Sequence, residues 1–237
     1  MICLFGEPED RELLWLAAAL RQRGEDVEFV LPEELMIGSA LSYRIEGSAN
    51  PSSLRLHDGR VIDASRPGVV VVNRLATLPL VRNERSLLDT SYLNEEWRAV
   101  LAAWLRTLPC PVLNPPRAGS LAGPMMVSSA VWCAIAHHCG LPTSAWRSNE
   151  VPALADPMEV VCLGSVVFDA AGSIPSAMKT SLAEMGRFIA TPLLGVTIDR
   201  RDDQWVFVDA TTWPTFSAAG EPFVDAVLAC AREGVIR

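Results

Sequence analysis

The chain has 237 residues, 50% of them hydrophobic and 20% charged, and its formal net charge is −8. This composition is typical of a globular protein and excludes a largely disordered one. The acidic balance argues against nucleic acid or an anionic membrane as the main partner. Among the 20 basic residues there is a single lysine, Lys179. Any mechanism that requires two lysines is therefore excluded.

Three features of the sequence bear on where the protein works. The N-terminus lacks the basic start and the long apolar centre of a signal peptide. The longest stretch without a charged residue or histidine contains glycine, proline and serine, so no membrane span is expected. The six cysteines are scattered in apolar runs, which favours reduced thiols over a disulfide framework. The sequence thus predicts a cytoplasmic protein that does not contact a membrane.

The beginning of the chain predicts a parallel sheet. A strand at 2–5, a helix at 9–23 and a strand at 27–31, ended by Pro32, form a β-α-β unit. The turn after the first strand, Gly6-Glu7-Pro8, has one glycine and two neighbouring acids, so it does not match a dinucleotide-binding fingerprint.

The next segments predict a hairpin and a further buried strand. Asp58-Gly59 is a two-residue turn signal between two short apolar runs. The β-branched run at 68–72 is typical of a strand buried on both faces, and it ends at Asn73-Arg74. Arg74 is therefore expected at the carboxyl edge of the sheet, where open α/β sheets bind ligands. Its guanidinium could bind a carboxylate or a phosphate, or it could equally lie in solvent at the rim.

The middle of the chain predicts a helix at 94–108. Asn94 is a suitable N-cap, acids occupy the first turn, and apolar residues recur on one face. Prolines then bracket a short strand at 112–113, and we predict a domain boundary near Arg117. Beyond it the expected elements are a helix at 125–139, strands at 160–163 and 165–168, a helix at 181–189, a hairpin of strands at 194–199 and 205–209, and a final helix at 222–232.

Four segments carry a resemblance to a known family. They are the β-α-β opening with the strand ending at Asn73-Arg74, Pro-Val-Leu-Asn-Pro-Pro at 111–116, Gly-Leu-Pro-Thr-Ser at 140–144, and Leu-Leu-Gly-Val-Thr-Ile-Asp at 193–199 leading into Trp-Val-Phe-Val-Asp-Ala-Thr-Thr-Trp-Pro at 205–214. Together they resemble an ATP-grasp protein of the ribosomal-modification and peptide-ligase branch. The resemblance implies an α/β fold. It places an open parallel, pre-ATP-grasp-like sheet in domain 1–117 and a truncated α+β ATP-grasp-like domain in 118–237.

The departures from the family pattern concern catalysis. The family's phosphate-binding lysine is missing from 120–124, and the Glu-x-Asn pair of the last strand is matched by Asp209-Ala210-Thr211. Thr197 stands where an acid normally follows the Leu-Gly step. The stretch from Ser144 to Gly195 is short for the central ATP-binding lid. The resemblance therefore implies a dismantled apparatus, with no cofactor expected and residual Mg·ATP binding as an alternative.

The candidate ligand-binding residues are Arg74, Arg147 and Lys179, although a surface role is the better explanation for Arg147 and a solvated turn is the better explanation for Lys179. Asp199 and Asp209 are candidate ligands of a weak Mg²⁺ site, although solvent-facing hairpin acids explain them as well. Two further sites are open alternatives. Cys133, His137, His138 and Cys139 share one helix and could hold a metal, and a Ser-His-Asp or Cys-His triad is possible because sequence spacing does not constrain it.

The resemblance implies two candidate functions, and the composition leaves a third open. The first is a non-catalytic, degenerate ATP-grasp-like accessory protein in a peptide- or small-molecule-modifying pathway, with a protein partner or a second copy of itself and without nucleic acid. The second is an ATP-dependent carboxylate–amine ligase that uses arginines for lysines or is completed by a partner subunit. The third is a cytoplasmic assembly module that acts through an apolar face.

Overall fold

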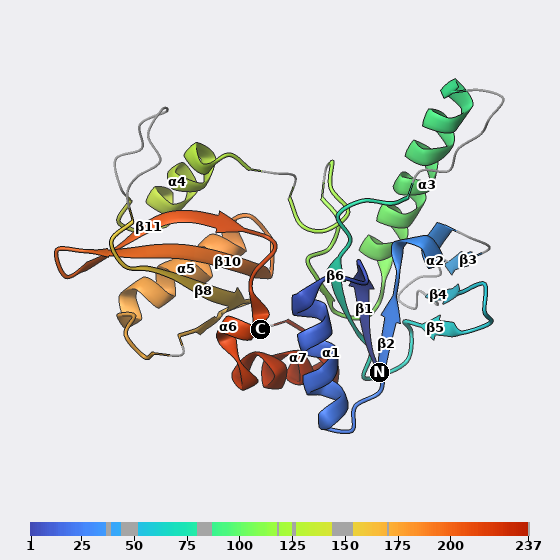
Figure 1. The fold of residues 1–237 in the computed structure, drawn as a ribbon, viewed down its shortest axis with the longest axis horizontal. Coiled ribbons are helices and arrows are strands. Elements are labelled where there is room, and N and C mark those ends of the chain that lie inside the picture. The colour runs from blue at the N-terminus through green and yellow to red at the C-terminus, as the bar shows by residue number, and fades with distance from the viewer. Residues whose placement is uncertain are drawn as a thin grey trace. The chain divides into compact units, whose positions relative to one another are not determined.

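The computed structural model describes residues 1–36, 39–43, 52–79, 87–117, 119–124, 127–143, 154–169 and 171–236. Its internal contacts divide the chain into two compact units (Figure 1). Unit 1 comprises Met1–Gly123 with Val227–Val235, and unit 2 comprises Pro124–Ala226 with Ile236. The division into domains 1–117 and 118–237 is untested by these contacts and stays a prediction.

Unit 1 is built on the predicted parallel sheet, whose strand order is β2-β1-β6-β7. Every neighbouring pair in it is parallel. The strands are β1 (Ile2–Gly6), β2 (Val27–Val30), β6 (Val70–Arg74) and β7 (Val112–Leu113). All five residues of β6 are buried, as the β-branched run predicts. Helix α1 (Arg11–Gln22) connects β1 to β2 and completes the β-α-β unit.

A second, antiparallel sheet of unit 1 has the order β3-β4-β5. Its strands are β3 (Ala40–Tyr43), β4 (Ser52–Arg55) and β5 (Val61–Asp63), and the predicted turn at Asp58-Gly59 joins the last two. Gly59 has a φ of 87°, a conformation that glycine adopts without steric cost. Pro32 was expected only to end β2. It also begins the short helix α2 (Pro32–Met36), because its fixed φ suits the first position of a helix.

The long helix α3 (Leu87–Thr107) differs from the prediction at its start. Asn94 is not an N-cap but lies within the helix, where its Nδ2 donates a hydrogen bond to the Thr90 carbonyl at 2.8 Å. The helix therefore begins before the polar residues that resemble a cap. Its buried face is as predicted, since Leu101, Trp104 and Leu105 are buried. The Trp104 ring stacks on the Phe5 ring, with 6.2 Å between the ring centroids.

Unit 2 is an antiparallel sheet of order β11-β10-β8-β9. Helices α4 and α5 pack on one face of it and form a shared apolar core with the strands. The elements are α4 (Ser129–His138), β8 (Pro157–Leu163), β9 (Val166–Phe168), α5 (Ser176–Phe188), β10 (Leu193–Arg201), β11 (Gln204–Thr211) and α6 (Phe216–Ala219). The last helix, α7 (Glu221–Glu233), begins in unit 2, and its residues from Val227 onward belong to unit 1. The predicted strands and hairpin are confirmed. The parallel sheet followed by an antiparallel α+β unit confirms the predicted fold class.

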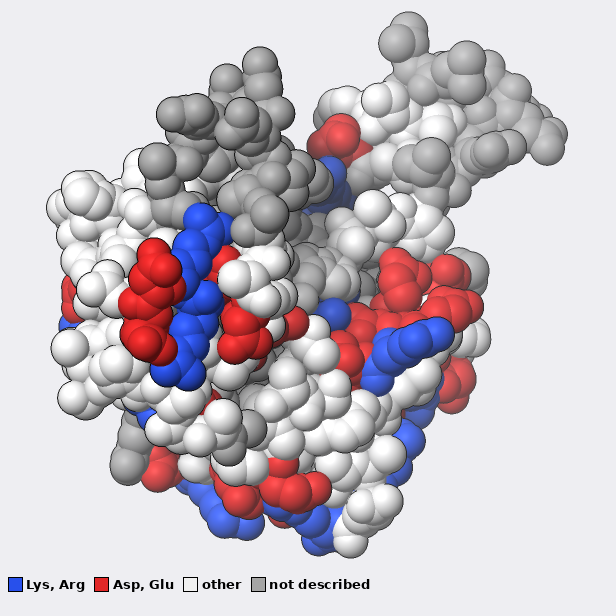
Figure 2. Space-filling view, turned by 60° about the vertical axis from the view of Figure 1, so that its left-hand side comes forward, with Lys and Arg blue, Asp and Glu red and all other residues white. Residues whose placement is uncertain are grey.

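Basic and acidic side chains lie beside one another at several places on the face shown in Figure 2. Ion pairs between exposed side chains of unit 2 include Arg200–Asp203 at 3.1 Å and Arg187–Glu184 at 2.6 Å. Among the described parts of the chain, no helix is both long and apolar enough to cross a bilayer.

Candidate functional site

A row of polar residues crosses three adjacent strands of unit 2. Thr197 of β10 lies opposite Glu159 of β8 on one side and opposite Asp209 of β11 on the other. Directly paired residues of antiparallel strands point to the same face of a sheet. Glu159 therefore lies beside Thr197 on the face opposite Val196, which belongs to the apolar core. The β10–β11 register shifts between Thr197 and Ile198, and Asp209 contacts α4, the helix that packs on the core face. We call Glu159, Thr197 and Asp209 the acidic row.

Glu159 binds the segment that follows β11. Its carboxylate accepts hydrogen bonds from the Thr215 backbone N–H at 2.8 Å and from the Thr215 hydroxyl at 2.7 Å. Gly195 makes this reach possible, since a Cβ at that position would lie 2.6 Å from the Glu159 Oε1 atom and 3.0 Å from the Pro214 Cα. The glycine of the Leu-Gly step thus provides the space in which Glu159 crosses to Thr215.

Asp209, at the other end of the acidic row, contacts helix α4. Its Oδ2 accepts a hydrogen bond from the Ser129 hydroxyl at 3.1 Å, and its Oδ1 accepts one from the Ala210 N–H. Ser129 is the first residue of α4, so the carboxylate lies near the positive end of the helix dipole.

Asp199 is fully buried and bound by protein donors. It accepts hydrogen bonds from the Arg201 Nε at 2.8 Å, the Asp156 N–H at 2.8 Å and the Ala155 N–H at 3.0 Å. Arg201 and these amides lower the pKa of Asp199 below its ordinary value. Its carboxylate fixes the segment before β8 to the hairpin.

Arg74 lies at the carboxyl edge of the parallel sheet, as predicted, but it is buried and not in solvent. Its Nε donates to the Asp10 Oδ2 at 2.7 Å, and both side chains are more than nine-tenths buried. The Asp10 Oδ1 accepts hydrogen bonds from the Glu12 and Leu13 N–H groups and caps α1. The carboxylate that Arg74 binds belongs to the protein itself, a pairing that neither alternative predicted. A role in ligand binding stays a prediction.

Lys179 lies in the first turn of α5, not in a turn between elements as the sequence indicated. Its Nζ is 3.3 Å from the Oδ2 of Asp169, a carboxylate with no exposed side-chain surface. Burial alone would raise the pKa of Asp169, but the Ile174 N–H and Lys179 lower it on balance. Arg147 lies outside the described residues. The structure therefore brings none of the described cationic candidates into the acidic row.

The alternative metal site on α4 has a different explanation. Cys133 is buried, and its Sγ lies 3.8 Å from the Val208 carbonyl oxygen. The His138 ring packs on the Phe188 ring, with 4.7 Å between the ring centroids. Within the described ranges, no group of three or more His, Cys, Asp and Glu residues could hold a metal ion.

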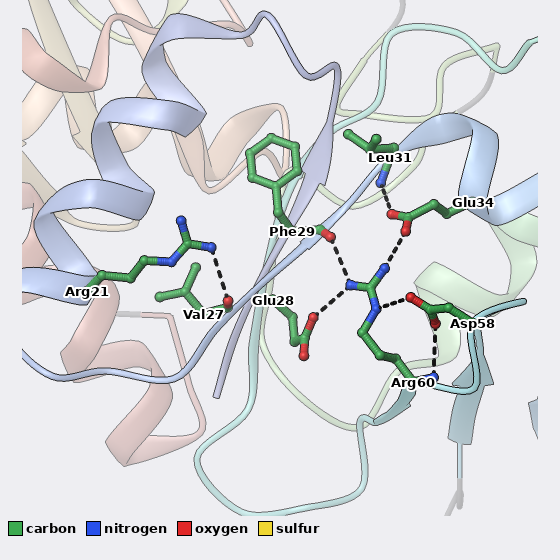
Figure 3. A network of polar contacts seen from close by, with 8 residues as sticks. All are labelled: Arg21, Val27, Glu28, Phe29, Leu31, Glu34, Asp58 and Arg60. Carbon is green, nitrogen blue, oxygen red and sulfur yellow. Dashed lines mark hydrogen bonds and ion pairs between the residues drawn. The ribbon is translucent and has the colours of Figure 1, made fainter.

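One polar network in unit 1 was missed by the sequence reasoning (Figure 3). The Arg60 guanidinium pairs with Glu28 at 2.9 Å, with Asp58 at 2.5 Å and with Glu34, and it also contacts the Phe29 carbonyl. It joins the β4–β5 hairpin to β2 and α2. Asp58 is part of the predicted Asp-Gly turn and Arg60 follows it, but the sequence does not show that Glu28 and Glu34 meet Arg60.

No protein-family model and no curated protein matches the sequence, whereas solved structures match it closely in fold. The ATP-grasp ligase PsnB, complexed with a phosphomimetic variant of its minimal precursor, Mg and ADP, gives a TM-score of 0.68 at 17% identity, over 97% of this chain and 98% of that one. The macrocyclase MdnC from Microcystis aeruginosa MRC, bound with the precursor peptide MdnA, gives a TM-score of 0.65 at 10% identity, over 99% of each chain. A RiPP-associated ATP-grasp ligase from Chryseobacterium gregarium, in complex with ADP and a leader and core peptide, gives a TM-score of 0.61 at 9% identity, over 98% of this chain and 96% of that one.

The chain has an ATP-grasp-like fold. This finding confirms the resemblance that the four sequence segments predict. At these identities the likeness concerns the fold alone, so the chemistry has to be argued from the residues of this chain. Thr197 and Asp209, which stand at the family pattern's acidic positions, lie opposite each other on the neighbouring strands β10 and β11. Glu159 was missed because it carries no motif of its own, and only strand register could reveal it.

Proposed function

We propose that this chain is a non-catalytic ATP-grasp-like accessory protein that binds a peptide or protein partner, with the chemistry supplied by that partner. One observation carries the proposal: the described candidate cations and buried acids are engaged with one another. Arg74 binds Asp10, Lys179 binds Asp169, and Asp199 binds Arg201.

Phosphoryl transfer needs cations and metal to neutralise the triphosphate charge, so that the reacting groups are held in line. For Lys179 to serve, it would have to leave Asp169, whose side chain has no exposed surface. A buried carboxylate stripped of its cation costs several kcal/mol or takes up a proton. The same cost applies to Arg74 and Asp10. Recruiting either cation to a nucleotide therefore opposes folding.

The peptide association rests on the solved structures of similar fold. PsnB is complexed with its precursor peptide PsnA2, and MdnC is bound with the precursor peptide MdnA. A fold shared over nearly the whole chain favours a partner of the same chemical kind for this protein.

Calorimetric titration with Mg·ATP tests the proposal. We expect no binding at millimolar nucleotide, and the same result for Asp209→Asn. A micromolar Kd that Asp209→Asn weakens, with an unchanged melting temperature, would overturn the non-catalytic assignment. Asp203→Asn is the matched control, since Asp203 lies in the exposed turn between β10 and β11 and pairs only locally with Arg200.

A carboxylate–amine ligase is the second candidate, favoured by the two carboxylates of the acidic row. In that case the chain would bind Mg·ATP by itself or after a partner subunit is added. ADP release on mixing with the partner, lost in Asp209→Asn but kept in Asp203→Asn, would establish it. The assembly-module reading, the cytoplasmic location and the absence of nucleic-acid binding stay predictions.

A further inference from the structure

The N-terminal half of α3 extends away from the parallel sheet of unit 1 (Figure 1). Three large apolar side chains are exposed along it: Tyr92 at 64%, Leu93 at 45% and Val100 at 41%. At 100° of rotation per residue, positions 92, 93, 96 and 100 share one helix face. They span about 12 Å at a rise of 1.5 Å per residue. We call Tyr92, Leu93, Glu96 and Val100 the outward face of α3.

The charge beside these apolar residues is negative. Glu96 lies within the outward face, and Glu95 is adjacent to it, and both residues are exposed. The Tyr92 hydroxyl donates a hydrogen bond to Glu96, which raises the pKa of Tyr92. Arg98 is on the opposite side of the helix, where its guanidinium donates to the Gly119 carbonyl at 2.5 Å. The outward face of α3 therefore presents apolar side chains around the Glu96 carboxylate, while Arg98 lies on the other side of the helix.

The charge decides which partner fits this face. Two copies packed symmetrically through it would bring Glu96 toward Glu96, and like charges in contact oppose association. An acidic partner is disfavoured for the same reason. A helical or extended segment with apolar side chains next to Lys or Arg buries Leu93 and Val100 and pairs with Glu96. We propose that the outward face of α3 binds such a basic amphipathic peptide segment of a partner. The proposal rests on the accessory function, because it names the class of that partner.

Fluorescence anisotropy with a labelled amphipathic helical peptide of Leu and Lys tests this proposal. The same peptide with Glu in place of Lys is the charge control. We expect the Leu–Lys peptide to bind and the double variant Leu93→Ser/Val100→Ser to bind about tenfold more weakly, a loss of about 1.4 kcal/mol. Glu96→Lys should weaken the Leu–Lys peptide and strengthen the Leu–Glu peptide. These substitutions are at exposed sites, so far-UV circular dichroism should not change.

Val131→Ser is the matched control, because Val131 is 49% exposed on the unrelated helix α4. It should leave peptide affinity unchanged. The proposal is overturned if the wild type does not bind the Leu–Lys peptide, if Val131→Ser weakens it as much as the α3 variant, or if Glu96→Lys has no effect. Sedimentation that shows a dimer abolished by Leu93→Ser/Val100→Ser would also overturn it, in favour of a second copy. The accessory function fails by a different result, namely binding of Mg·ATP by the wild type. In that case the α3 variants should bind Mg·ATP as the wild type does.

Discussion

Gly195→Ala should destabilise unit 2 by displacing Glu159. A Cβ at position 195 would lie 2.6 Å from the Glu159 Oε1, 3.0 Å from the Pro214 Cα and 3.0 Å from the Thr211 Cγ2. Glu159 is flexible enough to move, but in moving it gives up both hydrogen bonds to Thr215. The contact with the Pro214 Cα involves backbone, so the chain there has to shift as well.

The magnitude follows from these contacts. Hydrogen bonds to charged groups contribute about 1.5–3 kcal/mol each, and overpacking adds about 1–3 kcal/mol. Glu159 is half-buried and can be hydrated after it is displaced, so the low ends of both ranges apply. We expect a loss of about 4 kcal/mol in the free energy of unfolding, which lowers the melting temperature of a chain of this size by about 8–16 °C.

A double-mutant cycle with Glu159→Ala isolates the mechanism. Glu159→Ala removes both the clash and the hydrogen bonds, so Gly195→Ala should cost only about 1 kcal/mol in that background, from the Pro214 contact. Urea unfolding followed by circular dichroism measures all four proteins. A coupling energy of about 3 kcal/mol is expected. Strictly additive costs would refute the idea that Gly195 acts by making room for Glu159.

Three further predictions concern single sites. Asp203 has a φ of 63° in the β10–β11 turn, so Asp203→Gly should raise stability by about 0.5–1 kcal/mol in urea unfolding, and a decrease would contradict the turn geometry. The pKa of Asp199 is lowered in the folded state by Arg201, so its stabilisation is complete above the unfolded-state pKa and is lost as the pH falls through the lower folded value. Arg201→Met should move acid unfolding to higher pH, and an unmoved midpoint would argue against the pair. Burial raises the pKa of Cys3 and Cys162 to about 12, so both thiols should resist alkylation at neutral pH until the chain unfolds, and fast labelling of the native protein would exclude this burial.

The elements that the sequence predicts well are those with a strong local pattern. The β-branched run before Arg74 and the Asp58-Gly59 turn each carry their own physical cause, namely two-sided burial and turn geometry. The prediction of where α3 begins was wrong for a related reason. Asn94 with two following acids satisfies the local rule for a cap, yet a helix continues through such residues when its apolar face packs. Local chemistry predicts that a helix exists more securely than where it begins.

The partners of charged residues were not predictable in the same way. Glu159 meets Thr215 and Arg60 meets Glu28 only through strand register and the packing of separate sheets. The sequence gives no distance between such residues, so the candidate site could be proposed from motif positions but its contacts could not. Arg74 illustrates the difference: its place at the sheet edge was predicted, and its burial against Asp10 was not.

Burial also limits what these charged residues can do. An acid as deeply buried as Asp199 needs a cation or donors beside it, or else a proton, because an unpaired charge in a low-dielectric site is costly. Arg201 and two backbone amides fill that requirement. Any metal ion that approached Asp199 would compete with partners already in place. Asp209 differs, since a single side-chain hydroxyl and its neighbouring amide bind it at a half-buried position. It is therefore the acid at which substitution separates the two candidate functions most cleanly: it should matter for nucleotide binding in a ligase and have little effect in an accessory protein.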